Sequence, residues 1–254
     1  MFDEMLDLIL IGFIAVFLGG LTKGVTGFGY AVTGTALLAS FIPAKTAVII
    51  MLPALLATNI DIVHKYGFKE IWTRIKDFRF FAVSLIAGSV AGTLMIAALP
   101  QNIIEIGVGS VTLIYVLSKQ ELAEIDLFRG FKKFCLKKSH EYQGLLGLSA
   151  GLVFGSSNVG VPIVAVAQRI ENNHESFVAL LSGLMIASIT SRFITAYAVG
   201  LYRFDSFFTG MLLLVPGLFG LEVGEKIRGK LDEDIIRGSV TVLLVLIGIK
   251  LVFF

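Results

Sequence analysis

Long apolar stretches follow one another along the chain, and most polar residues gather in the segments between them. Several stretches reach about 18 residues with almost no charge, which is long enough to cross a hydrocarbon core of ~30 Å as an α-helix. We therefore predict an all-α polytopic membrane protein. Its unbroken membrane helices are expected at about residues 47–63, 80–99, 103–117, 177–199, 207–223 and 235–254.

Two further apolar regions, at residues 8–42 and 145–170, are interrupted by glycine and hydroxyl residues. The interruptions align at a spacing of 131 positions, and a second pair of glycines aligns at 132. The aligned pairs are Gly20 with Gly151, Gly24 with Gly155, Thr26 with Ser157, Gly29 with Gly160, Gly88 with Gly220, and Gly92 with Gly224. Chance matches in a glycine-rich membrane protein are the alternative, but the register holds across two separated elements, which favours an internal duplication.

The duplication divides the chain into a first membrane repeat at residues 1–118, a linker at 119–142 and a second repeat at 143–254. Each repeat is expected to hold one broken segment followed by three membrane helices. The first broken segment is too long for one span and slightly short for two, and the second could be one long span or two half-length helices. If both are re-entrant hairpins, each half holds three full crossings and the second half is inverted. Secondary transporters build substrate sites near the membrane midplane from such interrupted helices, and non-helical backbone at that depth must line a cavity or be buried in protein.

The positions of lysine and arginine favour an inverted second repeat. With inversion, 16 basic residues fall on one side and 3 on the other, whereas parallel repeats divide them 13 to 6. Positive residues concentrate on the cytoplasmic side of membrane proteins. The basic linker is cytoplasmic in both layouts.

Composition agrees with a bilayer-embedded protein. Hydrophobic residues make up 56% of the 254 residues and charged residues 16%, and the mean hydropathy is +0.88, whereas soluble domains carry about 25% charge. The single cysteine, Cys135, excludes an internal disulfide, and the three histidines share no metal-ligand spacing, so we expect no metal or cofactor. The acidic start predicts no cleavable signal peptide. The expected partners are the lipid bilayer and a small solute, not nucleic acid.

Two basic residues, Lys23 and Arg192, lie far from any loop. With the backbone N–H groups where half-helices begin, they favour an anionic substrate that carries several oxygens. Each also has a structural alternative: Lys23 could extend to the interface, and Arg192 could pair with Asp61 or Glu222. The polar residues expected to orient the anion beside them are Thr22, Thr26, Asn59, Ser157 and Asn158, although membrane hydroxyls often bond their own backbone.

Acidic residues in or near the membrane could couple transport to protons, because burial favours the protonated carboxyl group. Asp61 and Glu222 are the leading candidates, and Glu105 is the third. Pairing with Arg192, or a position at a helix end, would explain the same residues without a coupling role.

The chain resembles the TauE/SafE sulfite exporter family of bacterial and archaeal membrane permeases. The resemblance rests on the glycines from Gly20 to Gly29 with Phe28, on Gly160-Val161-Pro162, and on His64-x2-Gly67 followed by Trp72, with a weaker echo in Tyr197-x2-Gly200 and Phe204. It covers nearly the whole chain and implies transport of sulfite, sulfonates or related sulfur-containing anions across the cell membrane. The chain departs from the family pattern at Tyr30, after Gly29, and at Ser156-Ser157-Asn158, where glycines are common.

Three other functions compete with transport. A passive anion channel would use the same cations and amides. A membrane-embedded enzyme would need paired aspartates, a serine–histidine pair or a zinc motif at membrane depth, and the sequence shows none. An insertion factor would expose a wide polar groove and need not be internally duplicated. We therefore predict a transporter, with proton coupling expected and the oligomeric state open.

Overall fold

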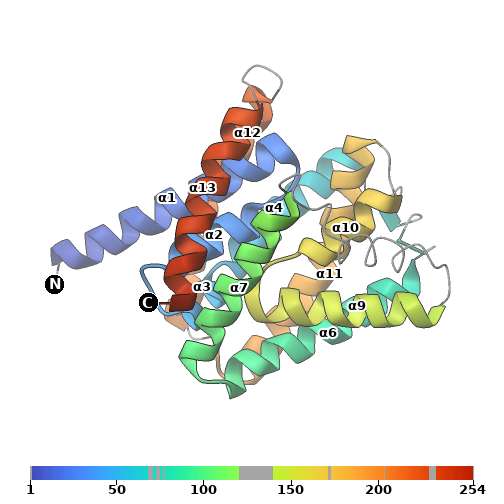
Figure 1. The fold of residues 1–254 in the computed structure, drawn as a ribbon, viewed down its shortest axis with the longest axis horizontal. Helices are drawn as coiled ribbons and strands as arrows, with labels where there is room; N and C mark the ends of the chain where they lie inside the picture. The colour runs from blue at the N-terminus through green and yellow to red at the C-terminus, as the bar shows by residue number, and fades with distance from the viewer. Residues whose placement is uncertain are drawn as a thin grey trace.

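The computed structural model describes residues 2–67, 71–72, 75–76, 78–119, 140–170, 173–202, 204–228 and 233–253. Helices make up nearly all of this part of the chain, and no strand occurs in it. Most of the predicted linker lies outside the described residues. The prediction of an all-helical protein is confirmed (Figure 1).

Among the described residues, six helices lie before the linker region and five lie after it. The first six are α1 (Phe2–Thr26), α2 (Tyr30–Ala39), α3 (Ala44–Ile50), α4 (Leu52–Tyr66), α6 (Arg79–Ala98) and α7 (Gln101–Lys119). The others are α9 (His140–Ser157), α10 (Val161–Ile170), α11 (His174–Ala198), α12 (Phe204–Ile227) and α13 (Glu233–Phe253). These bounds agree with the predicted spans to within a few residues, except that the span predicted as one unbroken helix at 47–63 is divided at Met51 into α3 and α4. Within the described residues, four helical segments are long and apolar enough to cross a membrane: Ala44–Tyr66, Arg79–Ala98, Glu175–Ala198 and Asp205–Ile227.

Both broken segments contain a real interruption, but each is shorter than the glycine pattern predicts. α1 continues as a helix through Gly19, Gly20 and Gly24, and the chain leaves the helix only at residues 27–29. Gly27 and Gly29 have φ of 82° and 96° there, a left-handed conformation that favours glycine. The second interruption covers residues 158–160, where Asn158 has φ of 63°. The expectation that the whole glycine run is non-helical is therefore wrong.

The other glycines allow helices to pack with their backbones nearly in contact. α1 packs against α12, and α9 packs against α6. A Cβ atom added at Gly220 would overlap the carbonyl oxygen of Phe17, and one added at Gly88 would overlap that of Leu148. Glycine costs a helix interior about 1 kcal/mol relative to alanine, and close helix packing offsets that cost here. The same backbone proximity involves Gly20, Gly24, Gly92, Gly151, Gly155 and Gly224.

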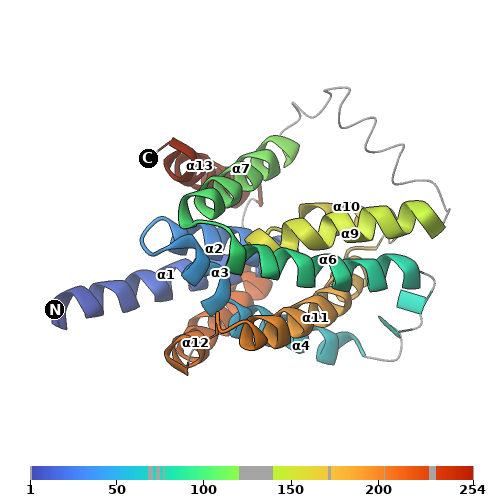
Figure 2. The same ribbon diagram turned by 90° about the horizontal axis from the view of Figure 1, so that it is seen from below.

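The remaining long helices complete a bundle around the two breaks. α4 packs against α11, and α7 packs against α13 (Figure 2). α7 and α13 are antiparallel, because Gly109 lies against Leu251 whereas Leu113 lies against Gly248. In both views the N-terminal end of α1 extends beyond the other helices.

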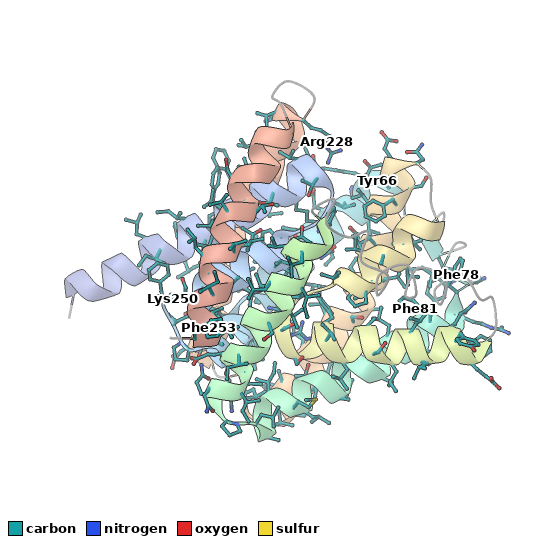
Figure 3. The ribbon with its side chains drawn as sticks, viewed as in Figure 1. Tyr66, Phe78, Phe81, Arg228, Lys250 and Phe253 are labelled. Atoms are coloured by element: carbon teal, nitrogen blue, oxygen red, sulfur yellow. The ribbon has the colours of Figure 1, made fainter. Side chains whose placement is uncertain are left out.

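Polar contacts tie helix ends together at opposite ends of the bundle. At one end Lys65 Nζ lies 2.9 Å from Glu225 Oε2, and the Arg228 guanidinium donates to the carbonyl oxygens of Gly24 and Val25. At the other end Lys250 Nζ donates to the carbonyl oxygen of Ser40 at 2.6 Å. Figure 3 shows Arg228 and Lys250 well apart, as expected when a 21-residue helix of about 30 Å separates them.

Candidate functional site

A small cavity lies where the two helix breaks meet. It has a volume of about 40 Å³, and its lining includes Gly27, Phe28 and Gly29 from the first break and Gly160 from the second. A space of roughly 10–15 Å³ on this measure holds one water molecule. The cavity is therefore on the scale of a few waters, which suits a small solute.

Two helices begin at this cavity. The first intrahelical bond of α2 runs from Thr33 N to Gly29 O, and that of α10 runs from Val164 N to Gly160 O. The N–H groups before those positions have no acceptor inside their own helices. Residues 29–32 at the start of α2 and residues 160–161 at the start of α10 line the cavity. The partial positive charge of two helix N-termini is thus directed at one small space.

Lys23 brings a basic side chain to the same cavity. It lies in the last turn of α1, where its side chain is 5% exposed, and Nζ donates to Asn59 Oδ1 at 2.8 Å. The Asn59 Nδ2 group donates to Leu55 O at 2.6 Å, which holds the amide oxygen toward Lys23. Both predicted residues line the cavity. Lysine and two helix N-termini together make a site suited to an anion.

Arg192 lies apart from this lining, in a buried hydrogen-bond network. Its side chain is 0% exposed; Nη1 donates to Asn158 Oδ1 at 2.5 Å and Nε donates to Thr93 Oγ1 at 3.3 Å. The guanidinium carbon lies 5.0 Å from the ring centroid of Phe154, a residue that lines the cavity. Asn158 Nδ2 in turn donates to Thr35 Oγ1 and to Val48 O. The network therefore ties the second break to α11, α6, α2 and α3.

The expected alternative for Arg192, an ion pair with Asp61 or Glu222, is not observed. Asp61 Oδ2 lies 2.7 Å from Lys65 Nζ, and Glu222 Oε2 lies 3.7 Å from Lys226 Nζ, in each case one turn along the same helix. The two acidic side chains are 37% and 62% exposed. Glu105 accepts a hydrogen bond from Gln101. Among the described residues, none of these three carboxylates lines the cavity.

The predicted hydroxyl residues bond mainly to nearby backbone. Thr22 Oγ1 donates to Leu18 O, Thr26 Oγ1 donates to Thr22 O, and Ser157 Oγ donates to Val153 O. Thr26 and Ser157 also accept from the N–H group two residues further on. They therefore have equivalent roles in ending α1 and α9, and neither lines the cavity.

Sequence patterns did not identify several residues at the site. Tyr115 lines the cavity, and Thr35 completes the Asn158 network. Tyrosine and threonine on apolar helices look like ordinary core residues, so only tertiary packing reveals these positions. Glu225 was also missed, because its link to Lys65 joins residues 160 positions apart.

Comparison with known families matches residues 12–251 to the sulfite exporter TauE/SafE family. The match covers almost the entire chain. The chain belongs to the TauE/SafE family. Neither the curated proteins nor the solved structures compared give a match.

Membership confirms the predicted family and identifies the chain as a membrane protein of a transporter family. TauE/SafE proteins are sulfite exporters by family description. The apolar helices agree with a multi-pass membrane protein.

Replacing Asn158 by alanine is expected to destabilise the protein by roughly 1–3 kcal/mol, because Arg192 Nη1 would lose its buried acceptor. Thermal unfolding in detergent would measure the loss. Ser156→Ala serves as the control, since the Ser156 hydroxyl bonds only to carbonyl oxygens of its own helix. Equal stability of the two variants would contradict a structural role for the Arg192–Asn158 pair.

Proposed function

We propose that this protein is a secondary transporter of a small sulfur-containing oxyanion, such as sulfite or a sulfonate, in the plasma membrane, and that transport is coupled to protons. The observation that carries the proposal is the convergence of two helix N-termini and Lys23 on one small cavity. The cavity suits an anion of few atoms. The TauE/SafE match supports a sulfur oxyanion as that substrate.

In this proposal Lys23 attracts the anion, and Asn59 and the N–H groups of α2 and α10 orient its oxygens. Arg192 adds positive potential from behind Phe154, and Asn158 holds it there. Thr22, Thr26 and Ser157 would contribute by fixing the ends of the two breaks. A cation in a low-dielectric site attracts an anion several-fold more strongly than in water, so Lys23 dominates affinity.

The proposal also includes two inverted repeats, at residues 1–118 and 143–254, joined by a cytoplasmic linker. Reciprocal packing supports the inverted repeats. The first helix of each half packs against the second of the three unbroken helices predicted in the other half: α1 packs on α12, and α9 packs on α6. The helices before the two breaks end at Thr26 and Ser157, and the helices after them begin at Tyr30 and Val161, so both pairs are 131 positions apart. The antiparallel α7 and α13 have the relation that inversion requires.

Single cysteines test this topology. With Cys135 replaced by serine, Gln101→Cys and Ser40→Cys are expected to react with a membrane-impermeant thiol reagent added from the outside. Ile227→Cys is expected to react only after the cytoplasmic face is opened. The reason is that Gln101 and Ser40 lie at the Lys250 end of the bundle, whereas Ile227 lies at the Arg228 end. Reaction of Gln101→Cys and Ile227→Cys from the same side would reject the inversion.

Flux in proteoliposomes tests the function. Sulfite, sulfate, thiosulfate, small sulfonates and carboxylates are each offered to reconstituted protein, with empty vesicles as the control. We expect saturable flux of at least one sulfur oxyanion, and accumulation against its gradient when a pH gradient is imposed. Failure of every sulfur anion to cross would contradict the proposed substrate class.

A passive anion channel is the second candidate, because the same lysine and helix N-termini would serve it. The two functions differ in what a pH gradient does. A transporter accumulates the anion uphill, whereas a channel only lets it run down its own electrochemical gradient. The small volume of the cavity favours the transporter.

A further inference from the structure

The cavity has one basic side chain and, among the described residues, no carboxylate. Its other ionisable lining groups are the phenols of Tyr30 and Tyr115, which are acids and cannot hold a positive charge. Lys23 is therefore the lining group that can carry a proton as a positive charge. The three carboxylates expected to couple protons lie elsewhere, exposed or hydrogen-bonded to neighbours on their own helices.

The hydrogen bonding of Lys23 is compatible with two protonation states. Among the described residues, the hydrogen-bond acceptor of Lys23 Nζ is Asn59 Oδ1, which is a neutral group. An ammonium and a neutral amine can both donate to that oxygen, so loss of a proton does not break the contact. A carboxylate partner would hold the ammonium form permanently, whereas a neutral amide does not.

The charged side chains on the helices that pack around Lys23 are grouped toward one end of it. Asp61 and Glu225 both interact electrostatically with it, but both are also paired with Lys65. Arg228 is engaged by the carbonyl oxygens at the end of α1. Burying an unpaired ammonium is costly, and the partly exposed carboxylates offset that cost less than a direct partner would.

We propose that Lys23 itself carries the coupled proton. The neutral amine takes up one proton as the anion enters, forming an ammonium–anion pair, and on the other side the anion leaves and the ammonium returns its proton to water. One proton and one anion then move in the same direction, so transport of a monovalent anion moves no net charge. This inference rests on the proposed function, because it assigns the coupling to the same cavity.

Proton uptake on anion binding is the direct test. Purified protein in a weakly buffered detergent solution is titrated with thiosulfate and with methanesulfonate, which stay ionised at neutral pH, and the pH change is followed with an indicator. Sulfite is titrated in parallel with a protein-free correction for its own protonation. We expect one proton taken up per anion bound, and an affinity that falls about tenfold per pH unit where the amine is neutral.

Two substitutions separate charge from proton transfer. Lys23→Arg keeps a positive charge that does not dissociate at accessible pH, so it should bind the anion without proton uptake and with no pH dependence. Lys23→Met has similar length and no charge, and should not bind. Asp61→Asn, Glu225→Gln, Glu222→Gln and Glu105→Gln should keep the uptake of the wild type.

Each outcome decides a different question. Anion binding without proton uptake in the wild type would overturn the coupling role of Lys23 but not the transport function. Loss of proton uptake in one of the carboxylate variants would have the same consequence. Absence of binding by every anion tested would instead reject the site, and with it the proposed function. If Lys23→Arg does not fold, the proton count and the pH dependence of the wild type still decide whether Lys23 carries the coupled proton.

Discussion

Replacing Lys23 by glutamine is expected to weaken anion binding by at least tenfold. Lys23 is the one basic side chain among the described residues that line the cavity, and losing its charge-assisted hydrogen bond to the bound anion costs about 1.5–3 kcal/mol. Glutamine retains an N–H donor for Asn59, so the structural contact has a replacement. The measurement is the dissociation constant of sulfite or thiosulfate, determined by calorimetry on purified protein.

A matched control separates this effect from a general loss of basic charge. Lys250→Gln removes a lysine at the far end of the bundle, where it bonds to Ser40 O, and is expected to leave the affinity unchanged. Thermal unfolding of both variants checks that they remain folded. A folded Lys23→Gln protein with wild-type affinity would place the anion site elsewhere.

Alanine at Gly88 or at Gly220 is expected to destabilise the protein by roughly 1–3 kcal/mol, the usual cost of overpacking a core. The new methyl group would meet a backbone carbonyl of the neighbouring helix, which cannot move aside as a side chain can. The two helices of the pair must separate instead. Thermal or denaturant unfolding in detergent measures the effect, and combining both substitutions should lower stability further, because they act on separate helix pairs.

Gly107→Ala provides the control for this prediction. Gly107 lies in α7, and a Cβ atom there would meet nothing within 4 Å. Alanine favours a helix over glycine by about 1 kcal/mol, so this variant should equal or exceed the wild type in stability. The packing role of the glycines would be rejected if Gly88→Ala behaved in the same way as Gly107→Ala.

The helices could be predicted from sequence because apolar length is a local property. The spans near 80–99 and 177–199 match α6 and α11 closely. The extent of the breaks could not be predicted, since glycine serves two physical purposes that look alike in a sequence. Gly29 supplies a left-handed turn, whereas Gly24 supplies room for α12. Only the position of the neighbouring helix distinguishes them.

The site was partly predictable for a similar reason. Lys23 and Asn59 stood out because polar side chains are rare in apolar segments, and both line the cavity. Phe154 lines the cavity and also contacts Arg192, which does not line it, and residue spacing in the sequence does not reveal such an arrangement. Whether Arg192 attracts the anion stays a prediction.

The reciprocal packing of α1 on α12 and α9 on α6 has a consequence for biosynthesis. α1 leaves the ribosome long before α12 exists, since residues 27–203 separate them. At about 5–20 residues per second, that interval is on the order of ten to forty seconds. During that interval Gly20 and Gly24 lack the helix against which they pack in the folded protein. The N-terminal half therefore cannot reach its final structure until translation is nearly complete, and a chain truncated before α12 should be a substrate for membrane quality-control proteases.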